Sequence, residues 1–275
     1  MSDLKTRLIS AMLLLPLVLT VVCIGQWPYI LLIVIVTLLA GREYVRMLER
    51  KGYHLSLPLL AAFILFWLIE AVWGDGTWLT PGLAGLCLAS VMWVLLRRAL
   101  GPATLYPTVE WALLWAGSVY VGITGSYLLR LRVLPDGLWW VLTALIIIWV
   151  GESAAYFVGS RWGRHKMAPS VSPGKSWEGF AGELMSSVLV GLFLGWLWPV
   201  LTRQPLALTA AKGALLGGVL SVLTPAGDFF VSMIKREVGV KDTSALIPGH
   251  GGMFDRIDSL LWAGFLTWVV VQLLG

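Results

Sequence analysis

The sequence predicts an all-α, polytopic membrane protein with about nine transmembrane helices and a cytoplasmic N-terminus. Of its 275 residues, 58% are hydrophobic and 13% are charged, whereas an ordinary soluble domain has about 25% charged residues. The mean hydropathy is +0.84, and the chain contains 16 tryptophans. This composition excludes a soluble enzyme, a disordered protein and a coiled coil.

Nine segments are long and apolar enough to cross a bilayer, which takes about 20 residues. They are 8–25, 28–47, 57–73, 78–96, 109–129, 137–159, 180–200, 208–230 and 258–274. The first resembles a secretory signal, but no small-x-small cleavage site follows it, so we expect a retained helix. Glu70 ends the third segment, and Pro225, Gly227 and Asp228 interrupt the end of the eighth.

The distribution of positive charge predicts the orientation. With the N-terminus in the cytoplasm and nine spans, 16 of the 20 lysines and arginines lie on the cytoplasmic side, as the positive-inside rule requires. The remaining four are Arg130, Arg132, Arg203 and Lys212. No basic tract interleaved with aromatic residues occurs, so the basic surplus predicts topology and phosphate handling, and no nucleic-acid partner.

The two parts of the chain differ in polarity. Residues 1–148 read as an N-terminal transmembrane scaffold, because their charges lie mostly at the ends of spans. Residues 149–275 read as a C-terminal catalytic region with two polar cytoplasmic loops, 160–179 and 231–257. Any chemistry is therefore expected in the second part.

Three aspartates near the C-terminus suggest a cation site. On a helix over 228–236, Asp228, Ser232 and Lys235 share one face, and Asp255 and Asp258 lie one turn apart at the start of the last span. Oxygen ligands of this kind suit Mg²⁺. Singly, the two later aspartates could merely cap a helix and the basic residues could merely anchor the topology. A mixture of acids and bases next to spans is costly, which favours a function.

Two loops carry further polar motifs. The run Pro248-Gly-His-Gly-Gly252 frees backbone N–H groups for phosphate oxygens. In the other loop, Gly174-Lys175-Ser176 is no nucleotide-binding P-loop, because Pro169 stands where that motif needs glycine. We expect a Pro-Gly turn that presents Lys175. Glu152, inside a span, is a functional candidate by its depth, with a buried hydrogen bond to Tyr156 as the alternative.

The stretch from Ser232 to Asp258, SMIKREVGVKDTSALIPGHGGMFDRID, resembles the signature of the phosphatidate cytidylyltransferases, or CDP-diacylglycerol synthases. The stretch HKMAPSVSPGKSWEGF is similar to a second cytoplasmic loop of that family. The resemblance implies conversion of CTP and phosphatidate to CDP-diacylglycerol and pyrophosphate in phospholipid biosynthesis. It also implies a paired cation site: Mg²⁺, with a second monovalent or divalent cation left open, on Asp228 and Asp255.

The resemblance also gives the other site residues their expected roles. The positive side chains expected to neutralise the phosphates are Lys235, Arg236, Lys241 and Arg256. The backbone of Gly251 and Gly252 is expected to contact phosphate oxygens, and His250 is expected to form a hydrogen bond with a phosphate. Asp242 and Asp258 are expected to support the metal ligands. The remaining predicted substrate-binding residues are Glu152, Ser153, Lys166, Ser172, Gly174, Lys175 and Ser232.

Two departures from the family pattern leave alternatives open. Glu152 stands where the family usually has aspartate, and Val231 stands where an acid is frequent. A paralogue with a different lipid phosphate, a transporter with an anion site and an inactive scaffold therefore stay as alternatives. A CDP-alcohol phosphotransferase is set aside, because neither Asp75-Gly76 nor Asp136-Gly137 is followed by Ala-Arg. The expected location is the bacterial cytoplasmic membrane, with the site facing the cytoplasm, and a homodimer is left open.

Overall fold

The computed structural model describes residues 2–100, 106–249 and 251–274. The prediction of helices throughout is confirmed for these residues, with one exception, a two-stranded antiparallel hairpin. In order, the elements are α1 (Ser2–Ile24), α2 (Gln26–Glu49), α3 (Leu57–Trp73), α4 (Leu79–Leu100), α5 (Pro107–Gly117), the π-helix η1 (Ser118–Ile123), α6 (Thr124–Val133), α7 (Gly137–Trp162), β1 (Lys166–Ala168), β2 (Ser172–Ser176), α8 (Trp177–Thr202), α9 (Ala210–Leu223), α10 (Pro225–Val238) and α11 (Phe254–Leu274).

The structure supports a membrane protein that crosses the bilayer several times. Six helical stretches of the described chain are long and apolar enough to span: Leu79–Leu100, Pro107–Val133, Gly137–Trp162, Trp177–Thr202, Ala210–Val238 and Phe254–Leu274. Two shorter apolar helices, Met12–Ile24 and Leu57–Trp73, accompany them. All nine predicted segments fall on helices, but the count of nine spans stays a prediction.

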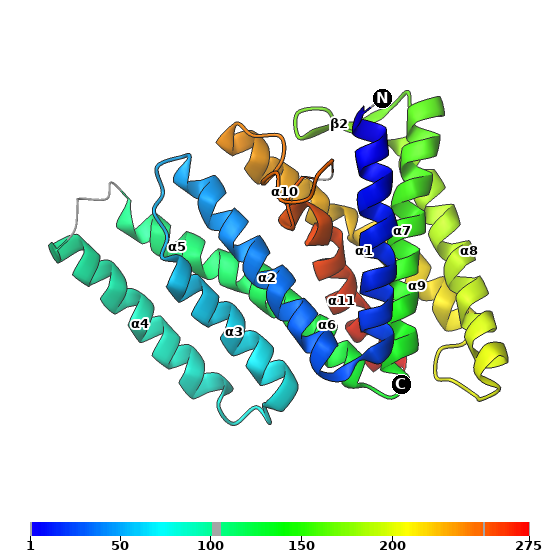
Figure 1. Cartoon of the computed structure of the whole chain (residues 1–275), viewed down its shortest axis with the longest axis horizontal. Coiled ribbons are helices and arrows are strands. Elements are labelled where there is room, and N and C mark those ends of the chain that lie inside the picture. The colour runs from blue at the N-terminus through cyan, green and yellow to red at the C-terminus, as the bar shows by residue number, and fades with distance from the viewer. Residues whose placement is uncertain (1, 101–105, 250, 275) are drawn as a thin grey trace.

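The two ends of the bundle differ. Figure 1 shows the N-terminus and the β hairpin at one end, and the C-terminus at the opposite end.

The break between α9 and α10 lies at Thr224, where the chain continues into Pro225 at the first position of α10. Because proline lacks an N–H, it suits the first turn of a helix and interrupts the one before it.

The hydrophobic core crosses the predicted boundary between residues 148 and 149. Both residues lie inside α7, and α11 packs against α2, α6 and α7.

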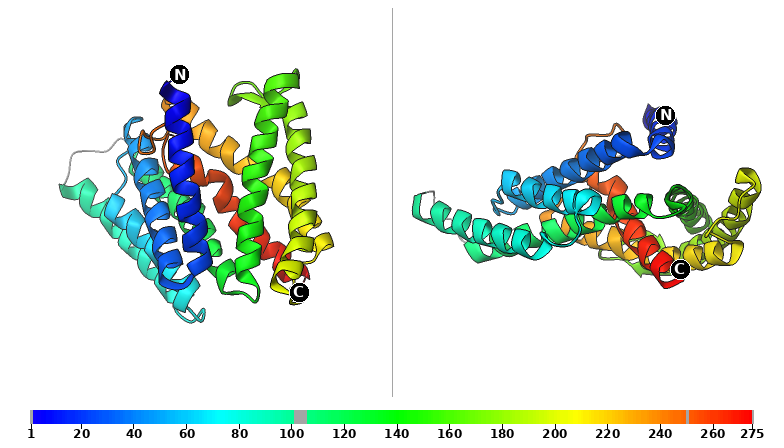
Figure 2. Two further views of the ribbon diagram at one scale, coloured as in Figure 1. Left: turned by 45° about the vertical axis from the view of Figure 1, so that its right-hand side comes forward. Right: turned by 90° about the horizontal axis from the view of Figure 1, so that it is seen from below.

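Helices α8 and α9 pack very closely: a Cβ added at Gly213 of α9 would lie 2.0 Å from the carbonyl oxygen of Gly191 in α8. Viewed from below, α4 and α8 lie at opposite edges of the molecule (Figure 2).

Candidate active site

A cavity of about 650 Å³ lies among α7, the hairpin, α8, α10 and the start of α11. Each of these elements supplies ionisable side chains to its wall. The acids are Glu152, Glu183, Asp228, Asp242, Asp255 and Asp258, and the bases are Lys166, Lys175, Lys235 and Arg256. Nine of these ten residues were predicted as site residues, and Glu183 was missed. Lys166 and Lys175 come from the hairpin.

The polar face of α10 is confirmed. The hydroxyl of Ser232 donates to Asp228 Oδ1 over 3.1 Å, and Lys235 Nζ lies 2.7 Å from Asp255 Oδ1. Val231, on the other side of the helix, is fully buried in the core. The helix ends at Gly239, whose φ of 79° suits glycine. Its amphipathic sequence thus turns one face to the core and the other to the cavity.

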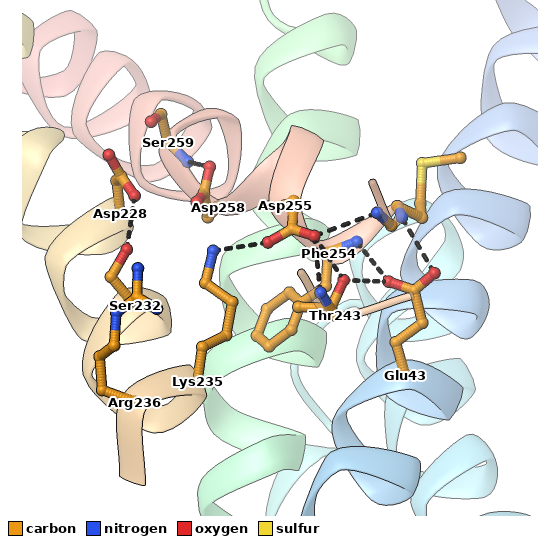
Figure 3. Close-up of polar contacts among 12 residues, drawn as sticks. Glu43, Asp228, Ser232, Lys235, Arg236, Thr243, Phe254, Asp255, Asp258 and Ser259 are labelled. Atoms are coloured by element: carbon orange, nitrogen blue, oxygen red, sulfur yellow. Dashed lines mark hydrogen bonds and ion pairs between the residues drawn. The ribbon is translucent and has the colours of Figure 1, made fainter. Parts of the chain in front are cut away.

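Asp255 is held by donors on both oxygens (Figure 3). Lys235 occupies Oδ1, while Oδ2 accepts from the backbone N–H of Thr243 at 2.8 Å and of Gly252 at 3.0 Å. The hydroxyl of Thr243 lies 2.9 Å from the same oxygen. Asp255 and Lys235 are both largely buried, with side chains 4% and 11% exposed. This carboxylate therefore orders the loop before α11 as well as facing the cavity.

A carboxylate from α2, Glu43, was not predicted as part of this region. It is 5% exposed and accepts hydrogen bonds from Thr243, Ser244, Met253 and Phe254. One feature of the sequence could have indicated a role for Glu43. It is an acid between Arg42 and Arg46, at the end of a span where the positive-inside rule alone would favour basic residues.

The hairpin brings Lys175 over the cavity. Its Nζ lies 2.7 Å from Asp228 Oδ2 and 4.3 Å from the centre of the Phe229 ring. The expectation of a simple Pro-Gly turn is wrong, because Ser172–Ser176 pairs with Lys166–Ala168 as a strand. Glu178, in the first turn of α8, accepts from the backbone N–H of His165 at 3.2 Å and fixes the base of the hairpin.

Deeper in the cavity the acids come close together. Asp228 and Glu152 lie near enough to Asp258 for their charges to repel it, and Glu183 is near Glu152, Asp228 and Lys175. Glu152 and Tyr156 both line the cavity. Within the described chain no group of three or more acids, histidines or cysteines has the spacing of a ready-made metal site.

Some predicted residues lie elsewhere. Ser232 contacts Asp228 without lining the cavity, and the Gly252 N–H is taken up by Asp255. Arg236 donates to the carbonyl of Val171, and Ser153 donates to the carbonyl of Trp149. The predicted residues that do not line the cavity are Ser153, Ser172, Ser232, Arg236, Lys241, Gly251 and Gly252. His250 lies outside the described residues. Their roles toward substrates stay predictions.

The lining has more acids than bases, six against four. Acids that lie this close together repel one another unless some of them are protonated or a cation shares the site. The hydroxyl and amide groups around the acids hold them in place. The arrangement can therefore bring phosphates, cations and fixed positive side chains together at one point.

The chain is similar to known proteins along nearly its whole length. Residues 5–274 match the sequence profile of the Cytidylyltransferase family. A phosphatidate cytidylyltransferase of Mycobacterium bovis is 31% identical over 265 residues, covering 90% of this chain and 81% of that protein. One of Bacillus subtilis is 31% identical over 265 residues, covering 95% of each. One of Haemophilus influenzae is 44% identical over 136 residues, covering 45% of this chain and 42% of that protein.

Proposed function

The chain belongs to the cytidylyltransferase family, and from that premise we propose that its cavity joins the cytidylyl group of CTP to the phosphate of phosphatidate. The products are CDP-diacylglycerol and pyrophosphate, which places the enzyme in phospholipid biosynthesis. One observation carries the proposal: charged residues from both motif segments, distant in sequence, line a single cavity at the hairpin end of an apolar helical bundle. A soluble nucleotide and a membrane lipid can meet at such a place.

The residues of the chain act by binding and orienting phosphates. A phosphate oxygen of phosphatidate attacks the α-phosphorus of CTP, and the bond from that phosphorus to the oxygen of the β-phosphate breaks as pyrophosphate leaves. Lys166, Lys175, Lys235 and Arg256 line the cavity and supply positive charge where negative charge gathers. A dedicated base is not needed, because the attacking phosphate is already anionic near neutral pH.

The proposal includes a divalent cation. The donor set fits one, since the acids outnumber the bases in the wall and carboxylate oxygens are the ligands that Mg²⁺ prefers. Asp228 and Asp255 would hold it, with Asp258 between them in the view of Figure 3. When bound, Mg²⁺ would supply positive charge that offsets the negative charge of the phosphates. Whether a second, monovalent or divalent, cation accompanies it is part of the same proposal.

We place the protein in the bacterial cytoplasmic membrane with nine spans and the cavity facing the cytoplasm. The relatives named above are bacterial, and the distribution of lysine and arginine supports this orientation. The opposite positions of the two termini in the bundle agree with an odd number of spans. A homodimer stays a prediction.

The test is an assay of purified protein in detergent micelles with CTP, phosphatidate and Mg²⁺. We expect a lipid product with the mass of CDP-diacylglycerol and one pyrophosphate for each lipid formed. EDTA should stop the reaction, and added Mg²⁺ should restore it. Asp228→Asn should abolish turnover, whereas Asp75→Asn should not, because Asp75 lies in an exposed turn, where its Oδ1 accepts from the Thr77 N–H at 2.9 Å. Turnover by Asp228→Asn at the wild-type rate would contradict the cation assignment.

The same preparation separates the rival functions. A paralogue would leave phosphatidate unchanged and convert another lipid phosphate with CTP, such as an isoprenoid phosphate. A transporter would move a solute across sealed liposomes without forming a new lipid. The gathering of the acids in one cavity near the hairpin favours the enzyme over a transporter.

A further inference from the structure

We infer that Glu43, a residue of α2 outside both motif segments, positions the active site by holding both ends of the loop before α11. The residues held are Thr243, Ser244, Met253 and Phe254, the last of which begins α11. The inference rests on the proposed function, since it concerns the same cavity. Glu43 lines no part of the cavity. It is therefore a positioning residue, which acts on the reaction through Asp255.

Both oxygens of Glu43 are used fully (Figure 3). Oε1 accepts from the hydroxyl of Ser244 at 2.6 Å and from the N–H of Met253 at 3.0 Å. Oε2 accepts from the hydroxyl of Thr243 at 2.8 Å and from the N–H of Phe254 at 2.8 Å. Four donors from one short stretch thus converge on one buried carboxylate, and hydrogen bonds to a charged acceptor are the stronger kind.

The donors of Glu43 connect it to Asp255. The hydroxyl of Thr243 lies between the two carboxylates, 2.8 Å from Glu43 Oε2 and 2.9 Å from Asp255 Oδ2. The N–H of Phe254, which precedes Asp255, is fixed by Glu43 as well. Asp255 in turn holds Lys235 at 2.7 Å. A shift of Glu43 therefore moves a cavity acid and its lysine together.

The close packing around Glu43 leaves little room for adjustment. A Cβ added at Gly252 would lie 2.4 Å from Glu43 Oε2 and 2.0 Å from the Thr243 hydroxyl. Only glycine fits there, so the loop can pass this close to the carboxylate. The negative charge also lies at the N-terminus of α11, where a helix favours an anion.

The decisive variant is Glu43→Gln. Glutamine keeps the length of the side chain but replaces one oxygen by an NH₂ group, which cannot accept the two hydrogen bonds that reach that position. A hydroxyl can turn away, but the N–H of Met253 or Phe254 cannot. Glu43→Asp keeps both acceptors on a shorter side chain and should recover part of the loss. The control is Glu110→Gln: Glu110 is 7% exposed and accepts from the His54 N–H at 2.8 Å. Its partners are His54 and Arg97, whereas Glu43 shares the Thr243 hydroxyl with Asp255.

Two measurements are made on each full-length variant in micelles. Amide hydrogen exchange reports the 243–254 loop, and steady-state kinetics with CTP and phosphatidate report the site. For Glu43→Gln we expect faster exchange confined to this loop and a kcat lower by about 10- to 100-fold, the loss that a small misplacement of reacting groups produces. KM for CTP should change less. Glu110→Gln should leave both the loop exchange and kcat as in the wild type.

A further variant tests the connection between Glu43 and Asp255. Thr243→Val removes the shared hydroxyl, and its effect on kcat should overlap with that of Glu43→Gln, so the double variant should lose less than the two single losses combined. Unchanged loop exchange or wild-type kcat in Glu43→Gln would overturn the inference, as would equal losses in Glu110→Gln. A wild-type protein that forms no CDP-diacylglycerol would refute the proposed function instead, and the exchange comparison would still decide the role of Glu43.

Discussion

Two aspartates of the cavity should behave differently when each is changed to asparagine. The Lys235–Asp255 pair is nearly closed to solvent, with side chains 11% and 4% exposed, whereas Lys175 and Asp228 are 28% and 31% exposed. Both pairs have the same separation of 2.7 Å. The comparison therefore sets a buried ion pair against a partly exposed pair of the same separation.

The expected magnitudes follow from that difference. Asp255→Asn leaves an ammonium buried without its counter-charge, and breaking a buried pair in this way lowers the free energy of unfolding by about 3–5 kcal/mol. The asparagine NH₂ group must also face either Lys235 or the donors of Thr243 and Gly252. Asp228→Asn breaks a partly exposed pair, which costs about 1 kcal/mol or less. Both variants should lose turnover, but Asp255→Asn should lose much more stability than Asp228→Asn.

Tryptophan fluorescence gives the readout, since the chain has 16 tryptophans. With each kcal/mol worth about 2–4 °C in a protein of this size, Asp255→Asn should lower Tm by about 6 °C or more and Asp228→Asn by much less. As a control, Lys235→Met combined with Asp255→Asn removes the unpaired charge and should regain part of the lost Tm. Equal Tm losses in the two single variants would show that burial does not distinguish these pairs.

Two further changes test the bundle and its orientation. Gly213→Ala should destabilise the protein by about 1–3 kcal/mol, because the added Cβ would lie 2.0 Å from a carbonyl oxygen of α8. The control is Gly218→Ala, whose Cβ would have its nearest neighbour at 3.8 Å. Equal Tm values of the two variants in a thermal melt would contradict the packing argument. In a background without cysteine, Asp75→Cys should react with an impermeant maleimide in intact cells and Arg164→Cys only after permeabilisation, since the two positions are expected on opposite sides; the reverse pattern would invert the orientation.

Periodicity and charge could predict much of this structure. The apolar segments found the helices because a span needs a long continuous run of such residues. The spacing of Asp228, Ser232 and Lys235 placed them on one face because a helix repeats every 3.6 residues. Their contacts confirm it. Local rules of this kind need only neighbouring residues.

The parts that the sequence could not predict depend on contacts between distant segments. Glu43 accepts hydrogen bonds from residues about 200 positions away in the sequence, and no local sequence pattern predicts these contacts. The hairpin has strands of three and five residues, one of them with proline and glycine, which is too short and irregular for a strand signal. Glu183 sits in an apolar helix, and only the approach of α8 to α7 shows that it faces the cavity.

The surplus of acids in the cavity wall bears on the order in which ligands arrive. On the proposed function, the acids of the wall would disfavour a bare triphosphate more than a nucleotide already complexed with a divalent ion, because the complex brings less negative charge. The protein would thus discriminate between two forms of one metabolite before touching its base or sugar. The rate of capture would then follow the concentration of the complex, which depends on the free divalent ion of the cell as well as on the total nucleotide.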